Sequence, residues 1–341
     1  MYVLQSGYLS KKLHVGRGCR QGDPIAPYLF LTGAEILAIL IKLNPDIVGL
    51  KLFSHYYNIT QFADDTTLIL DGSQRSLQAA LNTLEIFGNY SGLKMNKEKT
   101  KVIWIGRKKH SKDKLKITEK LDWSKTEFKL LGITFNVDLY QMPVINLNHI
   151  LESTVSDIKR WQLRQLTPIG KITVLKTLIL SKFIHIFSIL PIPESFIRKL
   201  NAIFFKFLWN NKPDKIKRET VCLDYQLGGL KMINVHAFIN SLKVSWVRRM
   251  FCQTECQWLI LFKEMYGITG KLYFESMWCD VLVKKMTNSF WVDVIKNWQI
   301  ILRKQKSKSN CDIMNCSLWY NPKSSKEPLY ISSWLKGGFH Y

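Results

Sequence analysis

The stretch Thr60-Gln61-Phe62-Ala63-Asp64-Asp65-Thr66-Thr67-Leu68-Ile69-Leu70 decides the fold of the first part of this chain. Apolar-rich runs at residues 57–62 and 66–70 flank the two aspartates, and β-branched residues dominate the second run. Such runs predict a strand, a tight turn and a second strand. Two adjacent carboxylates at a turn between buried strands call for a nearby cation, which a divalent metal would supply. The alternative is an ordinary turn, because Asp often accepts hydrogen bonds from its own backbone there.

If Asp64 and Asp65 bind a metal, Mg²⁺ suits them, with Mn²⁺ as a second possibility. Mg²⁺ binds one or two carboxylates together with substrate phosphates. In two-metal sites the ions hold the attacking and leaving oxygens of a phosphoryl transfer. The hairpin therefore predicts a site for phosphoryl chemistry.

A basic loop precedes the hairpin and reads Arg17-Gly18-Cys19-Arg20-Gln21-Gly22-Asp23-Pro24-Ile25-Ala26-Pro27. Its glycines would permit close approach of the backbone to a ligand. Asp23 as an N-cap and Pro24 at the first helical position predict that a helix starts here. Arg20 and Gln21 would then lie at a helix N-terminus, which favours phosphate. The alternative is an ordinary capped helix start.

A third segment follows the hairpin and reads Ser91-Gly92-Leu93-Lys94-Met95-Asn96-Lys97-Glu98-Lys99-Thr100-Lys101. Before it, residues 73–90 have the apolar periodicity of an amphipathic helix, and Ser91-Gly92 would end it. From Lys94 to Lys129 there are 13 basic and 5 acidic residues. Either a solvated face or a surface that neutralises a nucleic-acid backbone explains this surplus.

The other expected elements divide the chain into an α+β part and a helical part. Residues 1–15 predict a hairpin, and residues 128–135 predict one strand with Gly132 inside it. From about residue 146 the pattern is helical, with Thr167-Pro168 opening a helix and Pro191 closing it.

The net charge of +23 over 341 residues points to a polyanionic partner. Nucleic acid is the first candidate and an anionic membrane surface the second, while a merely soluble basic protein is the third reading. Seven scattered cysteines fit free thiols in a reducing compartment, without the spacing of a zinc site. We expect no membrane span, because polar residues interrupt the most apolar stretch, residues 178–190.

The order and spacing of these motifs resemble reverse transcriptases of the LINE (non-LTR retrotransposon) type. Arg20-Gln21-Gly22-Asp23-Pro24 resembles the family's template and nucleotide loop, and Phe62-Ala63-Asp64-Asp65 resembles its metal-binding hairpin. Ser91-Gly92-Leu93-Lys94 through Lys99-Thr100 is similar to the next palm motif. Three downstream segments are similar to segments that follow the polymerase in LINE proteins: Phe207-Leu208-Trp209, Gly228-Gly229-Leu230 and Leu318-Trp319-Tyr320-Asn321-Pro322. The second and third of these favour LINE proteins over group II intron maturases and telomerase, which share the palm.

The resemblance implies RNA-directed DNA synthesis on an RNA template with a DNA primer. It implies that Asp64 and Asp65 are catalytic metal ligands and that Arg20, Gln21 and Gly22 bind the nucleotide. Leu131 and Gly132 would form the primer grip. Lys99 would protonate the leaving pyrophosphate, with Lys94 as its rival and a solvated lysine as the alternative for both.

Two departures from the family pattern stand out. Ala26 replaces the usual Ser, which removes one hydroxyl. The family's first catalytic aspartate belongs upstream of the Arg20 loop, yet residues 1–19 contain neither Asp nor Glu. We therefore expect weakened metal binding and a polypeptide that does not polymerise DNA alone. The competing readings are a non-catalytic nucleic-acid-binding remnant and a relic of a decayed element.

The expected architecture has three parts. Residues 1–137 would form a partial palm, an antiparallel sheet backed by helices near 24–43 and 74–90. Residues 138–205 would form a helical thumb, and residues 206–341 a mostly helical C-terminal domain. The resemblance implies an intracellular protein, in the nucleus or in a cytoplasmic ribonucleoprotein.

Overall fold

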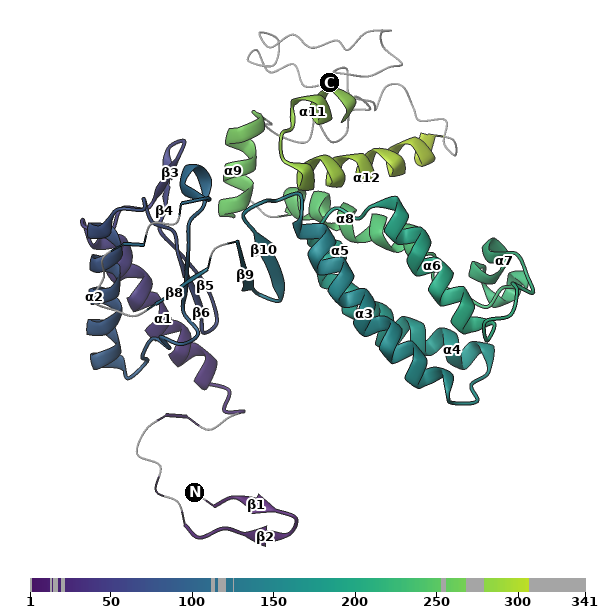
Figure 1. Cartoon of the computed structure of the whole chain (residues 1–341), viewed down its shortest axis with the longest axis horizontal. Coiled ribbons are helices and arrows are strands. Elements are labelled where there is room, and N and C mark those ends of the chain that lie inside the picture. The colour runs from purple at the N-terminus through teal and green to yellow at the C-terminus, as the bar shows by residue number, and fades with distance from the viewer. Residues whose placement is uncertain are drawn as a thin grey trace. The chain divides into compact units, whose positions relative to one another are not determined.

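The computed structural model describes residues 2–12, 14, 18–19, 22–111, 114–115, 121–124, 126–252, 256–267 and 279–306. The chain divides into two compact units, Met1–Leu131 and Gly132–Tyr341. Unit 1 mixes helices with small sheets, whereas the described residues of unit 2 are helical apart from one strand (Figure 1). The α+β class expected from the sequence is therefore confirmed at this level.

Short strand pairs make up the sheet content of unit 1. Three pairs are antiparallel, β1 with β2, β3 with β4 and β5 with β6. The pairing of β7 with β8 is parallel. The expected antiparallel pairing is therefore confirmed for three described pairs, and β7 with β8 departs from it. The strands are β1 (Leu4–Gln5), β2 (Tyr8–Leu9), β3 (Leu50–Leu52), β4 (His55–Tyr57), β5 (Ile59–Phe62), β6 (Asp65–Leu68), β7 (Lys101–Ile103), β8 (Asp122–Ser124) and β9 (Glu127–Leu130).

Two long helices support these strands, α1 (Ala26–Leu43) and α2 (Gln74–Ser91), and a short 3-10 helix, η1 (Gly106–Lys108), follows β7. The Ser73 side chain caps α2 by accepting from Ser76 N, and Gly92 ends the helix at a positive φ of 78°. The expected bounds of this helix are confirmed. The core of unit 1 joins apolar side chains of both helices to Ile59 and Leu68 of the β5–β6 hairpin.

Helix α1 starts later than the sequence suggested. Asp23 does not cap the helix directly: its side chain accepts from Ile25 N at 3.1 Å and closes a local turn. The helix begins at Ala26, and Pro27 rather than Pro24 lies in its first turn. The reason is that Asp and Pro support a tight turn as readily as a helix start.

Unit 2 is built almost entirely from helices. Its elements are β10 (Ile133–Asn136), α3 (Met142–Gln162), α4 (Pro168–Val174), the π-helix η2 (Leu175–Ile179), the 3-10 helix η3 (Leu180–Phe183), α5 (Ile184–Ile189), α6 (Glu194–Leu208), α7 (Arg218–Cys222), the 3-10 helix η4 (Tyr225–Leu227), α8 (Val235–Cys252), α9 (Gln257–Tyr266), α11 (Cys279–Lys285) and α12 (Ser289–Lys306). The predicted helix start at Thr167 is confirmed, because its side chain accepts from Gly170 N.

Two apolar clusters hold unit 2 together. The larger one gathers side chains of α3 to α6, including the fully buried Phe183, Phe187 and Phe204. The smaller one gathers α8, α9, α11 and α12 around Phe262, Leu282 and Val294. Close packing of this kind gives each cluster a fixed side-chain arrangement.

Two helical stretches, Ala26–Leu43 and Pro168–Ile189, are long and apolar enough to cross a membrane by length and composition, although the sequence analysis expected none. A core helix of a soluble protein can have the same length and composition. Both stretches supply core residues, Leu37 and Ile41 from the first and Phe183 and Phe187 from the second. Packing thus accounts for much of the second stretch, of which 44% is buried, but for little of the first, of which 17% is buried and in which Leu29, Leu31 and Leu43 are exposed.

Candidate functional site

The β5–β6 hairpin presents the two aspartates at its tip. Phe62 pairs with Asp65, so Ala63 and Asp64 form a two-residue turn and Asp65 opens the second strand. Ala63 adopts a positive φ of 48°, which is unfavourable for a residue with a Cβ. The predicted strand, tight turn and strand are confirmed. The strained turn determines the backbone positions from which the Asp64 and Asp65 side chains extend.

Packing and hydrogen bonds anchor the base of this hairpin. Ile59 and Leu68, a pair across the two strands, contact the core that α1 and α2 form. Gln61 Nε2 donates to the Ala34 carbonyl of α1 at 3.3 Å. The ladder continues beyond the strand ends, because Ile69 N donates to Asn58 O at 2.9 Å. The hairpin tip is therefore a fixed feature of unit 1.

The carboxylates of Asp64 and Asp65 are exposed. Neither is engaged in an ion pair or a side-chain hydrogen bond with another described residue. Among the described residues, no group of three or more His, Cys, Asp or Glu side chains comes together. Two free carboxylates fit a magnesium ion that takes its remaining ligands from substrate phosphates and water. They do not by themselves form a closed metal site.

The nucleotide loop is described in part. Arg20 and Gln21 lie outside the described residues, so the structure says nothing of their position. Gly22 has a φ of +87°, and a Cβ added there would meet no described atom within 4 Å. The left-handed backbone, rather than a close neighbour, is therefore what favours glycine at this position.

The segment that carries the two candidate lysines is a single turn after α2. Asn96 organises it: its side chain accepts from Lys99 N at 3.1 Å, and its carbonyl accepts from Thr100 N at 3.0 Å. The side chains of Lys94 and Lys99 are both exposed. No described contact links either lysine to the aspartates, so the assignment of Lys99 stays a prediction.

Leu131 and Gly132, the predicted primer grip, form a turn between β9 and β10. Their φ angles are 48° and 81°. The expectation of one continuous strand over residues 128–135 is therefore wrong. The turn places Leu131 at the end of unit 1 and Gly132 at the start of unit 2. Asn146 of α3 anchors β10, with its amide donating to Thr134 O at 2.8 Å and accepting from Thr134 N at 2.9 Å.

Unit 2 contains two buried lysines that no sequence pattern predicts. Lys171 Nζ donates to Phe207 O at 3.1 Å and also contacts Asn210, and burial lowers its pKa. Lys243 Nζ donates to Leu190 O at 2.6 Å and lies 2.9 Å from Asp293 Oδ2. Burial lowers the pKa of Lys243, and the Asp293 carboxylate opposes that shift. These partners lie far apart in the chain, so spacing carries no signal for them.

The outcome for the remaining motifs is mixed. Phe207, Leu208 and Trp209 are buried in the larger cluster of unit 2, so they are core residues. Gly228 has a positive φ of 74°, which confirms the predicted tight turn. The segment 318–322 lies outside the described residues, as do Cys311 and Cys316. The described cysteines are free thiols: Cys19, Cys222, Cys252, Cys256 and Cys279.

The hairpin lies in a segment of the chain that is similar to known proteins. Residues 2–135 match the family model described as reverse transcriptase (RNA-dependent DNA polymerase). The chain is 21% identical over 330 residues to the transposon TX1 uncharacterized 149 kDa protein of Xenopus laevis, covering 92% of this chain and 24% of that protein. It is 24% identical over 237 residues to the Pol polyprotein of the type-2 retrotransposable element R2DM of Drosophila melanogaster, covering 66% of this chain and 21% of that protein.

A third relative is the Pol polyprotein of the type-1 retrotransposable element R2 of Popillia japonica, which is 23% identical over 185 residues. That match covers 52% of this chain and 25% of the relative. The chain thus spans about a quarter of the length of the curated relatives it matches.

Proposed function

This chain carries a reverse transcriptase domain of the LINE (non-LTR retrotransposon) type, and we propose that it forms part of an RNA-directed DNA polymerase. The observation that carries the proposal is the Asp64–Asp65 tip of the β5–β6 hairpin, which falls inside the segment that matches the family model. RNA template, DNA primer and nucleoside triphosphate would be its substrates.

The two carboxylates would hold a divalent metal, with Mg²⁺ first and Mn²⁺ second. When bound, the metal would stabilise charge on the attacking 3′-oxygen and on the leaving pyrophosphate. The side chains and backbone of the protein would position the metal and the nucleotide. The hairpin fixes Asp64 in the turn and Asp65 at the strand start, and Gly22 would let the backbone of the nucleotide loop adopt its left-handed turn. Arg20 and Gln21 would contact the nucleotide, and Lys99 would donate a proton to pyrophosphate.

The architecture that we propose also follows from the resemblance to LINE-type reverse transcriptases. Residues 1–137 form a partial palm, residues 138–205 a helical thumb, and residues 206–341 a helical C-terminal domain. In support, all described strands but β10 belong to unit 1, and helices follow from Met142 onward. The thumb helices would lie on the template–primer duplex, and the turn at Leu131 and Gly132 would grip the primer.

We propose further that the 341-residue polypeptide extends a primer poorly by itself. The family resemblance implies three carboxylates, whereas no third acidic side chain joins Asp64 and Asp65 among the described residues. Losing one electrostatic contact to the transition state costs on the order of 10²–10³ in rate, and a bridging ligand should cost more. Binding of nucleic acid needs no such carboxylate, so it should persist.

Primer extension by the purified chain tests the catalytic part. With Mg²⁺ or Mn²⁺ we expect at most trace extension, which Asp64→Asn and Asp65→Asn abolish. Glu85→Gln, which removes one exposed negative charge from α2, should leave the trace unchanged. Robust extension by the unmodified chain would overturn the proposal of an incomplete site, and extension that survives both aspartate variants would overturn the site itself.

Binding to an RNA–DNA duplex tests the substrate part. We expect affinity to fall steeply as salt rises, because lysines and arginines displace counterions from phosphates. The net charge of +23 makes this the dominant force. An alternative function, a non-catalytic nucleic-acid-binding remnant, predicts the same salt dependence but no extension under any condition. We place either form inside the cell, in the nucleus or a cytoplasmic ribonucleoprotein, which fractionation would test.

A further inference from the structure

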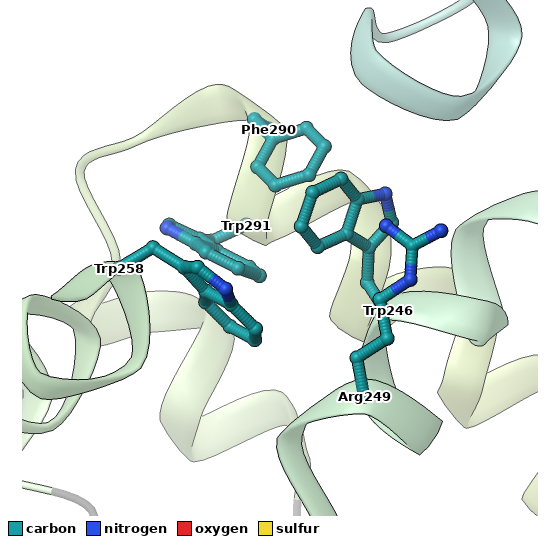
Figure 2. Close-up of a pocket in the computed structure, with 5 residues that line it drawn as sticks. All are labelled: Trp246, Arg249, Trp258, Phe290 and Trp291. Carbon is teal, nitrogen blue, oxygen red and sulfur yellow. The ribbon is translucent and has the colours of Figure 1, made fainter. Parts of the chain in front are cut away.

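Four aromatic side chains and one arginine surround a pocket of about 410 Å³ in unit 2, well outside the segment that matches the polymerase family. We call this site the tryptophan pocket (Figure 2). It draws on three helices, α8, α9 and α12. Its lining residues are Trp246, Arg249, Trp258, Phe290 and Trp291.

The rings are arranged as flat and perpendicular walls. Trp258 and Trp291 are stacked, with centroids 5.7 Å apart and an angle of 24° between the planes. Trp246 stands edge-on to both, at 5.6 Å from Trp258 and 6.1 Å from Trp291. Figure 2 shows the paired rings on one side and Trp246 with Arg249 on the other. Such walls accommodate a planar, apolar group better than a branched one.

The pocket is open to solvent but rests on a packed base. All four aromatic side chains are half-buried. Beneath them lies the smaller core cluster of unit 2, where Phe262 contacts Trp291 at a ring distance of 4.6 Å. Aromatic side chains that are held in place yet left partly open lose little entropy when a ligand stacks on them.

Arg249 is the charged residue that lines the pocket, and it favours an anionic ligand. The Arg249 guanidinium lies 4.6 Å over the Trp246 ring, and the arginine is exposed. It already occupies the cation-binding face of that ring and would repel a second cation, which argues against a quaternary ammonium ligand. Residues 235–306 contain eleven Lys and Arg against five Asp and Glu. The ligand should therefore combine a flat aromatic group with negative charge.

We propose that the tryptophan pocket binds an unpaired nucleobase of a single-stranded nucleic acid, with Arg249 contacting the adjacent phosphate. The inference rests on the proposed function in that the ligand is nucleic acid. It adds a single-strand contact separate from the aspartate hairpin. A base within a duplex is already stacked and paired, so the pocket selects single strands.

The test compares two oligonucleotides of equal length and charge, an oligothymidylate and an abasic strand, by fluorescence anisotropy with the 341-residue chain. Phosphate contacts are the same in both, so a difference in affinity reports base stacking. We expect the oligothymidylate to bind about tenfold more tightly, a modest share of what aromatic stacking contributes.

Two variants assign that preference to the tryptophan pocket. Trp258→Leu should reduce the base preference to about twofold or less, since it removes one stacking wall. Arg249→Gln should weaken binding of the oligothymidylate, whereas Arg248→Gln removes an equal charge from the adjacent, exposed position, which does not line the pocket, and should weaken it less. The arginine variants change exposed side chains and keep the fold, so they remain informative if Trp258→Leu fails to fold.

A photocrosslink gives a readout that needs no substitution. An oligonucleotide with 5-bromouracil should crosslink to peptides that contain Trp246, Trp258, Phe290 or Trp291. Crosslinks that map elsewhere would overturn the assignment of the tryptophan pocket as a nucleobase site, and so would a base preference that survives the variants. If the chain still binds the RNA–DNA duplex in that case, the proposed function stands. No binding of either strand or of duplex overturns both. Displacement by tetramethylammonium at constant ionic strength would show a cation pocket and overturn the nucleobase assignment.

Discussion

At the scale of single residues, the left-handed Ala63 sets the geometry of the aspartate tip. A positive φ costs an alanine roughly 1–2 kcal/mol, and positions of this kind are often retained at functional sites. The φ of 48° at Ala63 is thus a second reason, besides the two carboxylates, to regard this turn as functional.

Substitution of Ala63 tests that strain. Ala63→Gly should leave the free energy of unfolding within about 1 kcal/mol of the unmodified chain, because relief of strain offsets the entropy that glycine adds to the unfolded chain. Ala63→Val should lower it by at least about 1 kcal/mol. Ala34→Gly in α1, the control, should lower it by about 1 kcal/mol. Urea unfolding measures all three, and equal losses for both glycine variants would contradict the left-handed turn.

Buried Lys171 makes the stability of unit 2 depend on pH. Burial lowers the pKa of Lys171 below its ordinary 10.5, so the unfolded chain binds this proton more tightly than the folded chain. Stability should therefore rise with pH between the lowered pKa and 10.5. The contribution of Lys171 is least favourable at neutral and acidic pH.

The variant Lys171→Met removes this titration. We expect the free energy of unfolding of the unmodified chain, minus that of the variant, to increase as the pH rises from the lowered pKa of Lys171 toward its ordinary 10.5. Lys206→Met removes an exposed lysine from α6 and serves as the control, for which the difference should stay flat. Urea unfolding at a series of pH values gives both curves, and parallel curves for the unmodified chain and Lys171→Met would refute the argument.

At the scale of elements, the turn at Gly228 and Gly229 brings its backbone close to that of Leu223. A Cβ added to Gly229 would lie 2.1 Å from the Leu223 carbonyl oxygen, so the backbone would have to move. At Gly228 the obstacle is its φ of +74°, with no described atom within 4 Å of an added Cβ. The two glycines are therefore required for different reasons.

Alanine at the two positions should separate those reasons. Gly228→Ala should cost about 1 kcal/mol, and Gly229→Ala should cost more because close-packed backbone yields little. Gly33→Ala in α1, where a Cβ meets open space, should stabilise the chain by about 0.5–1 kcal/mol. Thermal or urea unfolding measures the order, and a smaller loss at Gly229 than at Gly228 would contradict the packing of this turn.

Elements with local signals could be predicted from the sequence. Helix α2 has a serine cap, a periodic apolar face and a terminal glycine, and its predicted bounds agree with the structure within one residue. The turn at Leu131 was missed because apolar residues continue on both sides of it, and a single glycine inside such a run also fits a continuous strand. The start of α1 was misplaced because Asp23 and Pro24 support a turn equally well.

At the scale of the whole molecule, some parts of the functional sites could be predicted from the sequence and others could not. The acidic hairpin is contiguous in sequence, so it could be predicted. The tryptophan pocket and the pair of Lys243 with Asp293 join helices about 50 positions apart, and no local pattern reveals such contacts. The net charge of +23 indicated a nucleic-acid partner without indicating where it binds.

The central claim is that Asp64 and Asp65 together hold a divalent metal beside the template–primer. Localised cleavage of the backbone by Fe²⁺ tests it most directly, because iron bound in a magnesium site generates radicals that cut the nearest peptide bonds. With template–primer and nucleotide present, we predict cuts within a few residues of the hairpin tip that excess Mg²⁺ suppresses and that Asp64→Asn with Asp65→Asn eliminates. Cleavage confined to other segments, or unchanged in the double variant, would contradict the account.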